Sequence, residues 1–498
     1  MGMSLEFTDD EKTLLLSNTK CTYSSCEDEE DKKKPDSFSN RYFVVLCILL
    51  CELCERLTYY GIVGNLVLYL TIELDYSSAA ASSISLVFTG FVYTTPLFGG
   101  LISDSFLGKL KTIFCSLFIY GIGTIILPII SIDYEKLNGG GLSLSEQRIL
   151  YLLALSLVAI GTGGIKTTVS PFGVQQLEDL GDGVIQTYFN WYYWFINIGS
   201  IIAYTIVVYI QQEISFAWGY TIPAASIIFA GLALLAGRKK YITTPPEGSI
   251  LSRMFNILGQ AISSSSCKPD EENSSFLDRA KEENGGTFRS KHVEEVKLMA
   301  RIIPVLFGTM LYWTVYVQMQ TSFVLQGERM NLVYGDFTFP VASLSVFNKI
   351  SLLLLIPLMD TVVYPLCDYL GFKLTQLKRM GFGMFLGAIA MIVAAGVEVS
   401  RKNIMDNGGY TDQIIVNASY NASTMTVFAQ IPQYFIFGAS EILTSITGME
   451  FAYSQAPKVL QGVLLGLFLF TAGLGSYLGS LLVIIVNAAT KGSYLVDK

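Results

Sequence analysis

The sequence predicts an all-α membrane protein that crosses the bilayer many times. Of its 498 residues, 51% are hydrophobic and only 15% are charged, whereas soluble domains are about 25% charged. The mean hydropathy is +0.48. The hydrophobic residues are concentrated in runs of about 20 residues or more, the length that an α-helix needs to cross a bilayer. These features exclude a soluble enzyme.

Eleven such runs can be counted, and a polar stretch divides them into six and five. The first six lie near residues 41–72, 80–103, 110–131, 149–176, 184–211 and 218–238. The other five lie near 294–325, 338–365, 372–399, 425–449 and 459–487. Two halves of six helices make up the major facilitator architecture of membrane transporters. We therefore expect this fold, with two helical bundles and 11 of the 12 transmembrane helices present.

The runs divide the chain into four segments. These are a polar tail (1–40), an N-terminal six-helix bundle (41–240), a linker (241–292) and a C-terminal bundle of five helices, truncated before the twelfth (293–498). Lys and Arg concentrate in the tail, the linker and the loops on the same side of the membrane, for example at Lys109 and Arg238. Because basic loops face the cytosol, we expect a cytosolic N-terminus and a cytosolic linker.

Two short motifs predict location. Glu11 lies four residues before the pair Leu15 and Leu16, a spacing that resembles the sorting signal read by clathrin adaptors for endosomes and lysosomes. A chance leucine run in the tail is the alternative. Asn417 and Asn421 each begin an Asn-X-Ser sequon, which predicts N-glycosylation of a non-cytosolic loop. We expect a multi-pass glycoprotein of the endosome or lysosome membrane.

The first apolar run contains three charged residues, Glu52, Glu55 and Arg56. Each charge costs about 3 kcal/mol at the centre of a bilayer, so we expect these side chains to face a water-filled cavity. With Tyr59 they occupy positions i, i+3, i+4 and i+7 and share one helix face. This pattern predicts a role in moving protons or in holding a charged solute.

Lys166 is the charged residue of the fourth run, and it follows the small residues Gly161, Gly163 and Gly164. Small residues let helices approach closely, and a lysine inside the membrane needs a carboxylate partner. The acids of the first run are the expected partners. Protonation of an acid would break such a pair and free Lys166 for an anionic group of the solute. A purely structural ion pair between two helices is the alternative.

Glu441 is a lone acid in the tenth run. It is suited to bind an ammonium group, and Asn348 in the eighth run can offer a carbonyl oxygen to the same group. Lys349 can instead neutralise Glu441, and both interpretations stay open. Trp313 in the seventh run suggests an aromatic wall. A cationic pole in the first and fourth runs and an anionic pole at Glu441 fit a zwitterion such as a peptide or an amino acid.

Neither catalytic chemistry nor a cofactor is indicated. The single histidine, His292, lies in a polar stretch, and the sequence shows no metal-ligand spacing and no recognisable pair of nucleophile and base. No basic patch of the size that nucleic acids require is present. We expect a protein that is not an enzyme, holds no metal or cofactor and uses protons as its coupling ion.

Five segments carry longer motifs. Residues 52–61 read Glu-Leu-Cys-Glu-Arg-Leu-Thr-Tyr-Tyr-Gly, and the others lie at 99–109, 189–200, 315–326 and 440–458. In this order they resemble signatures of the proton-coupled oligopeptide transporter family, in its peptide/histidine transporter branch (solute carrier family 15 type). The resemblance extends from about residue 41 to residue 487.

The resemblance implies symport of protons with di- and tripeptides, and in this branch with histidine, from the endolysosomal lumen to the cytosol by alternating access. It implies proton coupling by Glu52, Glu55, Arg56 and Lys166, and substrate binding by Arg56, Tyr59, Tyr60, Lys166, Trp313, Asn348 and Glu441. Many members have an acid where this chain has Val317, so coupling would rely on the first and tenth helices. A transport-deficient scaffold that recruits a cytosolic innate-immune signalling adaptor is the alternative.

Overall fold

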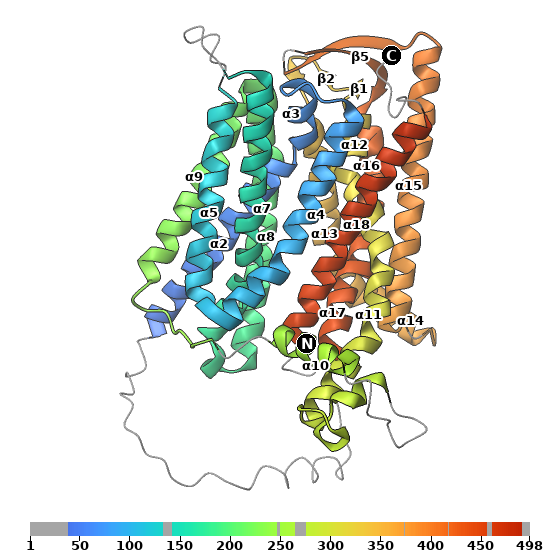
Figure 1. The fold of residues 1–498 in the computed structure, drawn as a ribbon. Coiled ribbons are helices and arrows are strands. Elements are labelled where there is room, and N and C mark those ends of the chain that lie inside the picture. The colour runs from blue at the N-terminus through green and yellow to red at the C-terminus, as the bar shows by residue number, and fades with distance from the viewer. Residues whose placement is uncertain are drawn as a thin grey trace. The chain divides into compact units, whose positions relative to one another are not determined.

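The computed structural model describes residues 38–132, 142–246, 250–263, 275–372, 374–416, 418–455 and 461–490. Residues Arg41–Lys498 form one unit, and the description below concerns that unit. Its helices fall into two groups, one before and one after the linker (Figure 1). We call α2–α9 the first group and α11–α18 the second group.

The first group contains the six predicted runs as helices. Its elements are α2 (Phe38–Val63), α3 (Leu66–Ile72), α4 (Ser78–Ile102), α5 (Lys109–Ile130), α7 (Leu144–Gln175), α8 (Asp182–Ile202) and α9 (Phe216–Gly237). Short π-helical turns follow α4 at Ser103–Leu107 and α8 at Ala203–Val207 and Ile210–Ile214, and a 3₁₀ turn lies at Glu178–Leu180. The start of α7 has a capping box, because Ser143 and Glu146 each satisfy a backbone amide of the other.

The second group contains the other five runs. Its helices are α11 (Ser290–Tyr316), α12 (Ser322–Gly327), α13 (Ser345–Leu358), α14 (Tyr364–Tyr369), α15 (Gln376–Asp406), α16 (Ile431–Glu441), α17 (Thr447–Gln455) and α18 (Gln461–Ala489). Single 3₁₀ turns lie at Val317–Gln320, Val341–Leu344 and Val427–Gln430, and π-helical turns at Met359–Val363 and Ile442–Ile446. The linker itself carries α10 (Ile250–Ser263) and 3₁₀ turns at Phe276–Ala280 and Glu282–Asn284.

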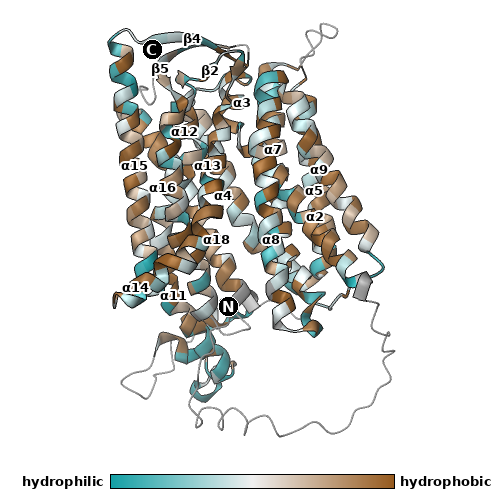
Figure 2. Ribbon diagram, turned by 180° about the vertical axis from the view of Figure 1, so that it is seen from behind, coloured by the Kyte–Doolittle hydropathy of each residue, from teal (hydrophilic) through white to brown (hydrophobic). Residues whose placement is uncertain are grey.

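Within the described residues, nine helices are long and apolar enough to cross a membrane. α2 is not among these nine, and it is the helix that carries Glu52, Glu55 and Arg56. Figure 2 shows hydrophobic residues along the long helices and hydrophilic residues gathered in the linker. The predicted class, a helical polytopic membrane protein, is therefore confirmed.

Two small sheets, which the sequence analysis did not predict, lie at one end of the helices (Figure 1). β1 (Met330–Asn331), β5 (Ala418–Thr426) and β4 (Tyr410–Ile415) form one sheet in that order, and β2 (Val333–Tyr334) pairs with β3 (Phe337–Thr338) in the other. The buried Gln413 joins β4 to the chain before β1, since its Nε2 donates to the carbonyl oxygens of Glu328 and Met330 at 2.8 and 2.9 Å. We call this end the sheet face.

Three hydrogen bonds connect the two helix groups near the sheet face. Ser343 Oγ donates to the Tyr204 carbonyl oxygen at 2.7 Å, the Val341 amide donates to Gln212 Oε1 at 3.3 Å, and Ser480 Oγ donates to the Ser83 carbonyl oxygen at 3.3 Å. Buried apolar residues, Val208 and Ala342 among them, pack beside these bonds. The two groups are therefore held together at this end of the molecule.

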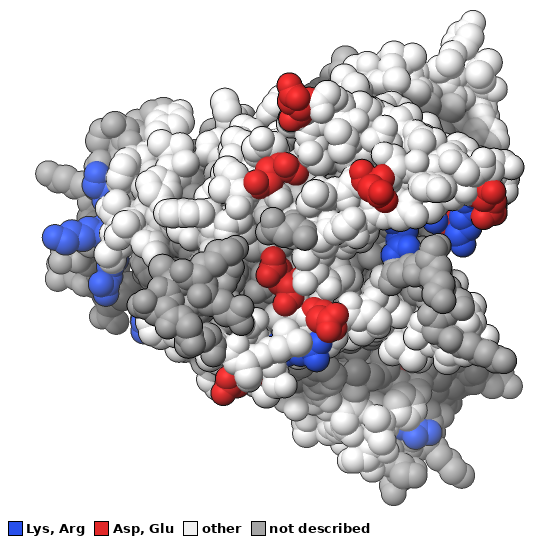
Figure 3. Space-filling view, turned by 90° about the horizontal axis from the view of Figure 1, so that it is seen from above, with Lys and Arg blue, Asp and Glu red and all other residues white. Residues whose placement is uncertain are grey.

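The sheet face itself is sparsely charged. Figure 3 looks onto it and shows isolated acidic and basic side chains on a largely uncharged surface. Asn421, one of the two predicted glycosylation residues, lies on β5 and is exposed there, opposite Asp412 of β4. Asn417 and the predicted sorting residues Glu11, Leu15 and Leu16 lie outside the described residues.

Candidate functional site

The three charged residues of α2 form an ion-paired cluster in the interior. Glu52 is 2% exposed, Glu55 is 0% exposed and Arg56 is 9% exposed. Arg56 Nε lies 3.1 Å from Glu52 Oε1, and Arg56 Nη2 pairs with Glu55 Oε2. The helix geometry thus brings the three groups together, as their spacing predicts. One arginine pairs with two carboxylates, so the cluster carries one excess negative charge when both acids are ionised.

Close helix packing places Lys166 near this cluster. A Cβ atom at Gly161 would lie 2.6 Å from Tyr120 Cβ, and one at Gly163 would lie 2.6 Å from Thr95 Cβ. Both distances are far shorter than side-chain contacts allow, so α7 approaches α5 and α4 closely only because these positions are glycine. The predicted role of the small residues before Lys166 is therefore confirmed.

Lys166 does not form the ion pair that the sequence analysis expected. Its Nζ lies 4.4 Å from the ring centroid of Tyr59 and 4.1 Å from that of Tyr93. This nitrogen is buried, and among the described residues it has no hydrogen-bond partner. The carboxylates are taken by Arg56, which is closer along α2 and offers several donors to them. The buried amine of Lys166 therefore makes its direct contacts with two aromatic faces and not with a carboxylate.

A second cluster surrounds Glu441 at the end of α16. Tyr316 Oη donates to Glu441 Oε2 at 2.9 Å, and Asn348 Nδ2 donates to the same oxygen at 3.3 Å. Lys349 Nζ lies 3.9 Å from Glu441 Oε1. Asn348 therefore presents its amide nitrogen to the acid, which leaves its amide oxygen available for the predicted ammonium group. Lys349 thus lies close enough to neutralise Glu441, and binding of a substrate ammonium group by this acid stays a prediction.

Two tyrosine rings of α2 connect the clusters. The rings of Tyr59 and Tyr60 meet edge to face with centroids 5.1 Å apart. Lys349 Nζ lies 5.7 Å from the centroid of Tyr60, while Lys166 Nζ lies 4.4 Å from the centroid of Tyr59. The path from one lysine to the other thus crosses two neighbouring rings. The first and second helix groups contribute one cluster each to a single site.

The remaining predicted residue, Trp313, lies one ring away from Glu441. Its ring packs edge-on against Tyr316 at 5.3 Å and against Phe468 at 5.9 Å. Trp313 is 7% exposed, and its indole nitrogen has no hydrogen-bond partner within the described residues. Its observed role is to support the tyrosine that holds the acid.

Tyr93 of α4 is a site residue that the sequence analysis missed. It forms one face of the Lys166 environment and interacts electrostatically with Arg56, Lys349 and Glu441. A tyrosine in an apolar helix gives no signal of its own, because packed tyrosines are common in cores. The role of Tyr93 becomes visible only from its contact with Lys166 of α7.

Comparison with known proteins identifies the family of this chain. The family model described as the POT family matches residues 110–496. Solute carrier family 15 member 3 of Mus musculus is 32% identical over 484 residues, covering 88% of this chain and 83% of its own length. Protein NRT1/PTR FAMILY 8.1 of Arabidopsis thaliana is 34% identical over 495 residues, covering 89% and 85%.

Solved structures show the same fold. A crystal structure of an auto-inhibited POT family peptide transporter superposes with a TM-score of 0.75 at 24% identity, covering 91% of this chain and 90% of the other. A crystal structure of a proton dependent oligopeptide (POT) family transporter gives a TM-score of 0.68 at 25% identity, covering 90% and 93%. The members of this family are transporters and not enzymes. This chain is a multi-pass membrane protein that belongs to the POT family of transporters.

Proposed function

We propose that the protein is a proton-coupled symporter that moves di- and tripeptides and histidine from the endolysosomal lumen to the cytosol by alternating access. The observation that carries this proposal is the buried amine of Lys166, which forms no direct ion pair among the described residues and is linked through the rings of Tyr59 and Tyr60 to the Glu441 cluster. Burial of a cation costs free energy unless an anion pairs with it. A substrate carboxylate would supply that anion.

The other end of the substrate meets Glu441. Lys349 lies 3.9 Å from this acid, which is longer than a direct N–H···O hydrogen bond. A substrate ammonium group that enters the site can displace Lys349 and bind Glu441 directly. Both poles then act on one zwitterion, and its length must match the separation set by the Tyr59 and Tyr60 rings.

The α2 cluster is suited to carry the proton. Glu52 and Glu55 share Arg56, so a proton on either acid removes a negative charge without leaving Arg56 unpaired. Arg56, Glu55 and Glu52 all interact electrostatically with Lys166. Protonation therefore raises the positive potential at Lys166 and strengthens its attraction for a carboxylate. In this way proton and substrate binding favour each other.

The hydrogen bonds near the sheet face support an alternating-access cycle. The two helix groups are bonded there, so this conformation is the one closed on that side. Because the exposed Asn421 of β5 begins a sequon, we assign the sheet face to the lumen and the opposite face, with the linker, to the cytosol. The acidic di-leucine pattern in the tail supports an endolysosomal location and clathrin adaptors as partners.

Uptake into cells tests the proposal. The double substitution Leu15→Ala and Leu16→Ala should bring the protein to the cell surface, where labelled histidine and dipeptide uptake can be measured at external pH 5.5 and 7.5. Lys166→Ala and Glu441→Gln should each reduce uptake at pH 5.5 at least tenfold. Lys239→Gln, a change of an exposed lysine outside the site, should leave uptake unchanged.

Three results would contradict parts of the proposal. Equal uptake at both pH values would exclude proton coupling. Surface protein that binds cytosolic partners but shows no uptake with the unmodified site would favour the scaffold alternative. Preserved uptake in Lys166→Ala would exclude Lys166 as the carboxylate-binding group.

A further inference from the structure

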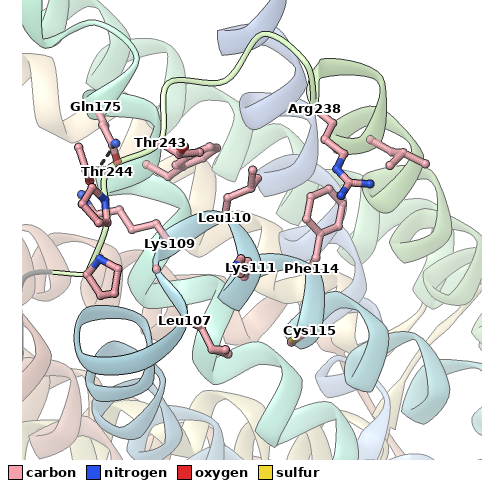
Figure 4. Close-up of a pocket in the computed structure, with 15 residues that line it drawn as sticks. Leu107, Lys109, Leu110, Lys111, Phe114, Cys115, Gln175, Arg238, Thr243 and Thr244 are labelled. Atoms are coloured by element: carbon pink, nitrogen blue, oxygen red, sulfur yellow. Dashed lines mark hydrogen bonds between the residues drawn. The ribbon is translucent and has the colours of Figure 1, made fainter. Parts of the chain in front are cut away.

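A basic pocket lies at the end of the first helix group that is opposite the sheet face, where α5 begins and α7 and α9 end (Figure 4). Its volume is about 840 Å³. Lys109 and Lys111 line it from α5, and Arg238 lines it from the end of α9. Lys111 and Arg238 are exposed and Lys109 is half-buried. The peptide site described above uses none of these three cations.

Among the described residues, few acidic groups offset the positive charge of this pocket. Among the described residues, Lys109, Lys111 and Arg238 take part in no ion pair. Lys109 interacts electrostatically with Asp104 on the π-helical turn before α5, without direct contact. Within the described part of the chain, the three cations thus face at most one distant carboxylate, so the pocket favours an anion with several negative charges.

The wall of the pocket formed by residues 241–246 is fixed in place. Gln175 Nε2 donates to Thr244 Oγ1 at 3.1 Å. The side chain of Gln176 both donates to the Ile242 carbonyl oxygen at 2.9 Å and accepts from the Ile242 amide at 2.8 Å. Gly108, at φ +75°, turns the chain so that a Cβ atom there would lie 3.8 Å from the Thr244 carbonyl oxygen. The hydrogen bonds from Gln175 and Gln176 therefore hold this wall of the pocket against α7.

An apolar groove of about 420 Å³ adjoins the basic pocket. The two share Leu107 and Cys115, and the groove continues between α4, α5 and α7 along Phe98, Ile102 and Ile160. These three side chains are exposed, at 57%, 43% and 45%, on helices long enough to span the membrane. They therefore face lipid. A polar opening with an apolar extension matches an amphiphile better than it matches a soluble anion.

We propose that this pocket binds the phosphorylated head group of an anionic phospholipid of the phosphoinositide class, with one acyl chain in the adjoining groove. Each Lys or Arg near a membrane surface contributes about 1 kcal/mol of attraction to anionic lipid, and three converge here. Phosphoinositides lie in the cytosolic leaflet, so the proposal uses the orientation assigned above. It does not depend on which substrate the protein transports.

Lipid binding to the purified full-length protein tests the proposal. Native mass spectrometry would count retained phosphatidylinositol 4,5-bisphosphate against phosphatidylcholine. The double variant Lys111→Gln with Arg238→Gln should bind the phosphoinositide at least tenfold more weakly. Lys239→Gln changes an adjacent exposed lysine that does not line the pocket, and it should bind like the unmodified protein. An equal loss in Lys239→Gln, or equal retention of the two lipids, would overturn the proposal.

Cys115 gives a local probe of occupancy. Its side chain is exposed and lines both the pocket and the groove. The phosphoinositide should slow alkylation of Cys115 at least fivefold, while Cys367 in the second group reacts at an unchanged rate. Inositol trisphosphate, which lacks acyl chains, should protect Cys115 only weakly. If it protects as well as the lipid at equal concentration, the pocket binds a soluble anion and the lipid assignment is wrong.

Discussion

Lys349 and Glu441 stand 3.9 Å apart at the centre of the second cluster, while Tyr316 and Asn348 bind the same carboxylate at 2.9 and 3.3 Å. The lysine is therefore the weakest-held of the three partners. It can move away from Glu441 while Tyr316 and Asn348 keep their hydrogen bonds to the acid. This arrangement orients Glu441 and leaves it open to a second cation.

The first prediction concerns the ammonium end of the substrate. Glu441→Gln preserves shape but removes the charge, so binding of a dipeptide with a free amino group should weaken at least tenfold, about 1.4 kcal/mol. An N-acetylated dipeptide has no ammonium group, and its weak binding should not change. Competition against a labelled dipeptide measures both. Equal losses for the two ligands would show that Glu441 acts on the fold and not on the amine.

The second prediction concerns Lys349 itself. Because it competes with the ligand ammonium for Glu441, Lys349→Gln should lower the KM for dipeptides about threefold and leave the N-acetylated ligand unaffected. Lys402→Gln, a change of a lysine on α15 whose side chain is 62% exposed, serves as the matched control. A higher KM in Lys349→Gln would show that this lysine binds substrate directly.

The third prediction tests the packing that positions Lys166. Gly163→Ala would place a Cβ atom 2.6 Å from Thr95 Cβ, and overpacking of this kind costs about 1–3 kcal/mol. The melting temperature in detergent should fall and uptake should be lost. At Gly231 on α9 nothing lies within 4 Å of an added Cβ, so Gly231→Ala should change neither. An unchanged melting temperature in Gly163→Ala would mean that α4 and α7 are not in close contact.

The sequence identified the charged members of the site because each of them breaks an apolar run. Glu52, Glu55 and Arg56 pair as their spacing on one helix indicates. The partner of Lys166 could not be predicted, since it depends on how α2 and α7 face each other. Arg56 pairs with both acids, and Lys166 lies against the rings of Tyr59 and Tyr93 instead. A charged residue inside an apolar run is thus recognised as a candidate for function, but the identity of its partner depends on helix packing.

The same limit applies to the sheets. β1 and β5 pair across Met330 and Ser423, which are far apart in the sequence and lie in loops between helices. The two-residue strands at Met330–Asn331, Val333–Tyr334 and Phe337–Thr338 are too short to produce an alternating pattern. β2 and β3 pair with each other locally, whereas β1 depends on long-range pairing with β5, which a single sequence does not display.

The fourth prediction concerns the linker. Asp278 is 6% exposed and accepts hydrogen bonds from Lys281 and Lys297 at 2.7 and 2.6 Å. Burial raises the pKa of this carboxyl, but the two lysines and the Ser275 amide outweigh that effect and hold its pKa below the usual value. Asp278→Asn would remove one of the two acids that Lys281 and Lys297 share and leave them only the more exposed Glu294. It should speed hydrogen exchange in α10 and at the start of α11 at least fivefold.

Glu282→Gln is the control for this prediction, because Glu282 is exposed in the same linker and forms no ion pair within the described residues. It should leave hydrogen exchange unchanged. Equal protection in Asp278→Asn would mean that the apolar contacts of the linker, such as Leu277 and Ala280, hold it without the ion pairs.

The fifth prediction concerns pH at the sheet face. Glu328 follows α12, is 2% exposed, and its Oε1 has no hydrogen-bond partner among the described residues. Burial raises its pKa from 4.5 to about 8, although Arg329 opposes the shift. Between these values the folded protein keeps a proton that the unfolded chain releases. The free energy of unfolding therefore decreases as the pH rises from 4.5 to 8, and Glu328 favours the folded state in an acidic compartment.

Glu328→Gln removes this dependence, because a glutamine side chain is neutral at every pH. Relative to the unmodified protein, its melting temperature should rise by about 2 °C between pH 5 and pH 7.5. Asp412→Asn on β4 is the control, since Asp412 is exposed in the same sheet, and it should show no such difference.

Arg329 and Tyr420 are the other titratable groups that interact with Glu328. Both keep their charge state between pH 5 and 7.5, because their ordinary pKa values lie at or above 10. A pH-dependent difference that appears in Asp412→Asn but not in Glu328→Gln would place the titrating group elsewhere in the sheet.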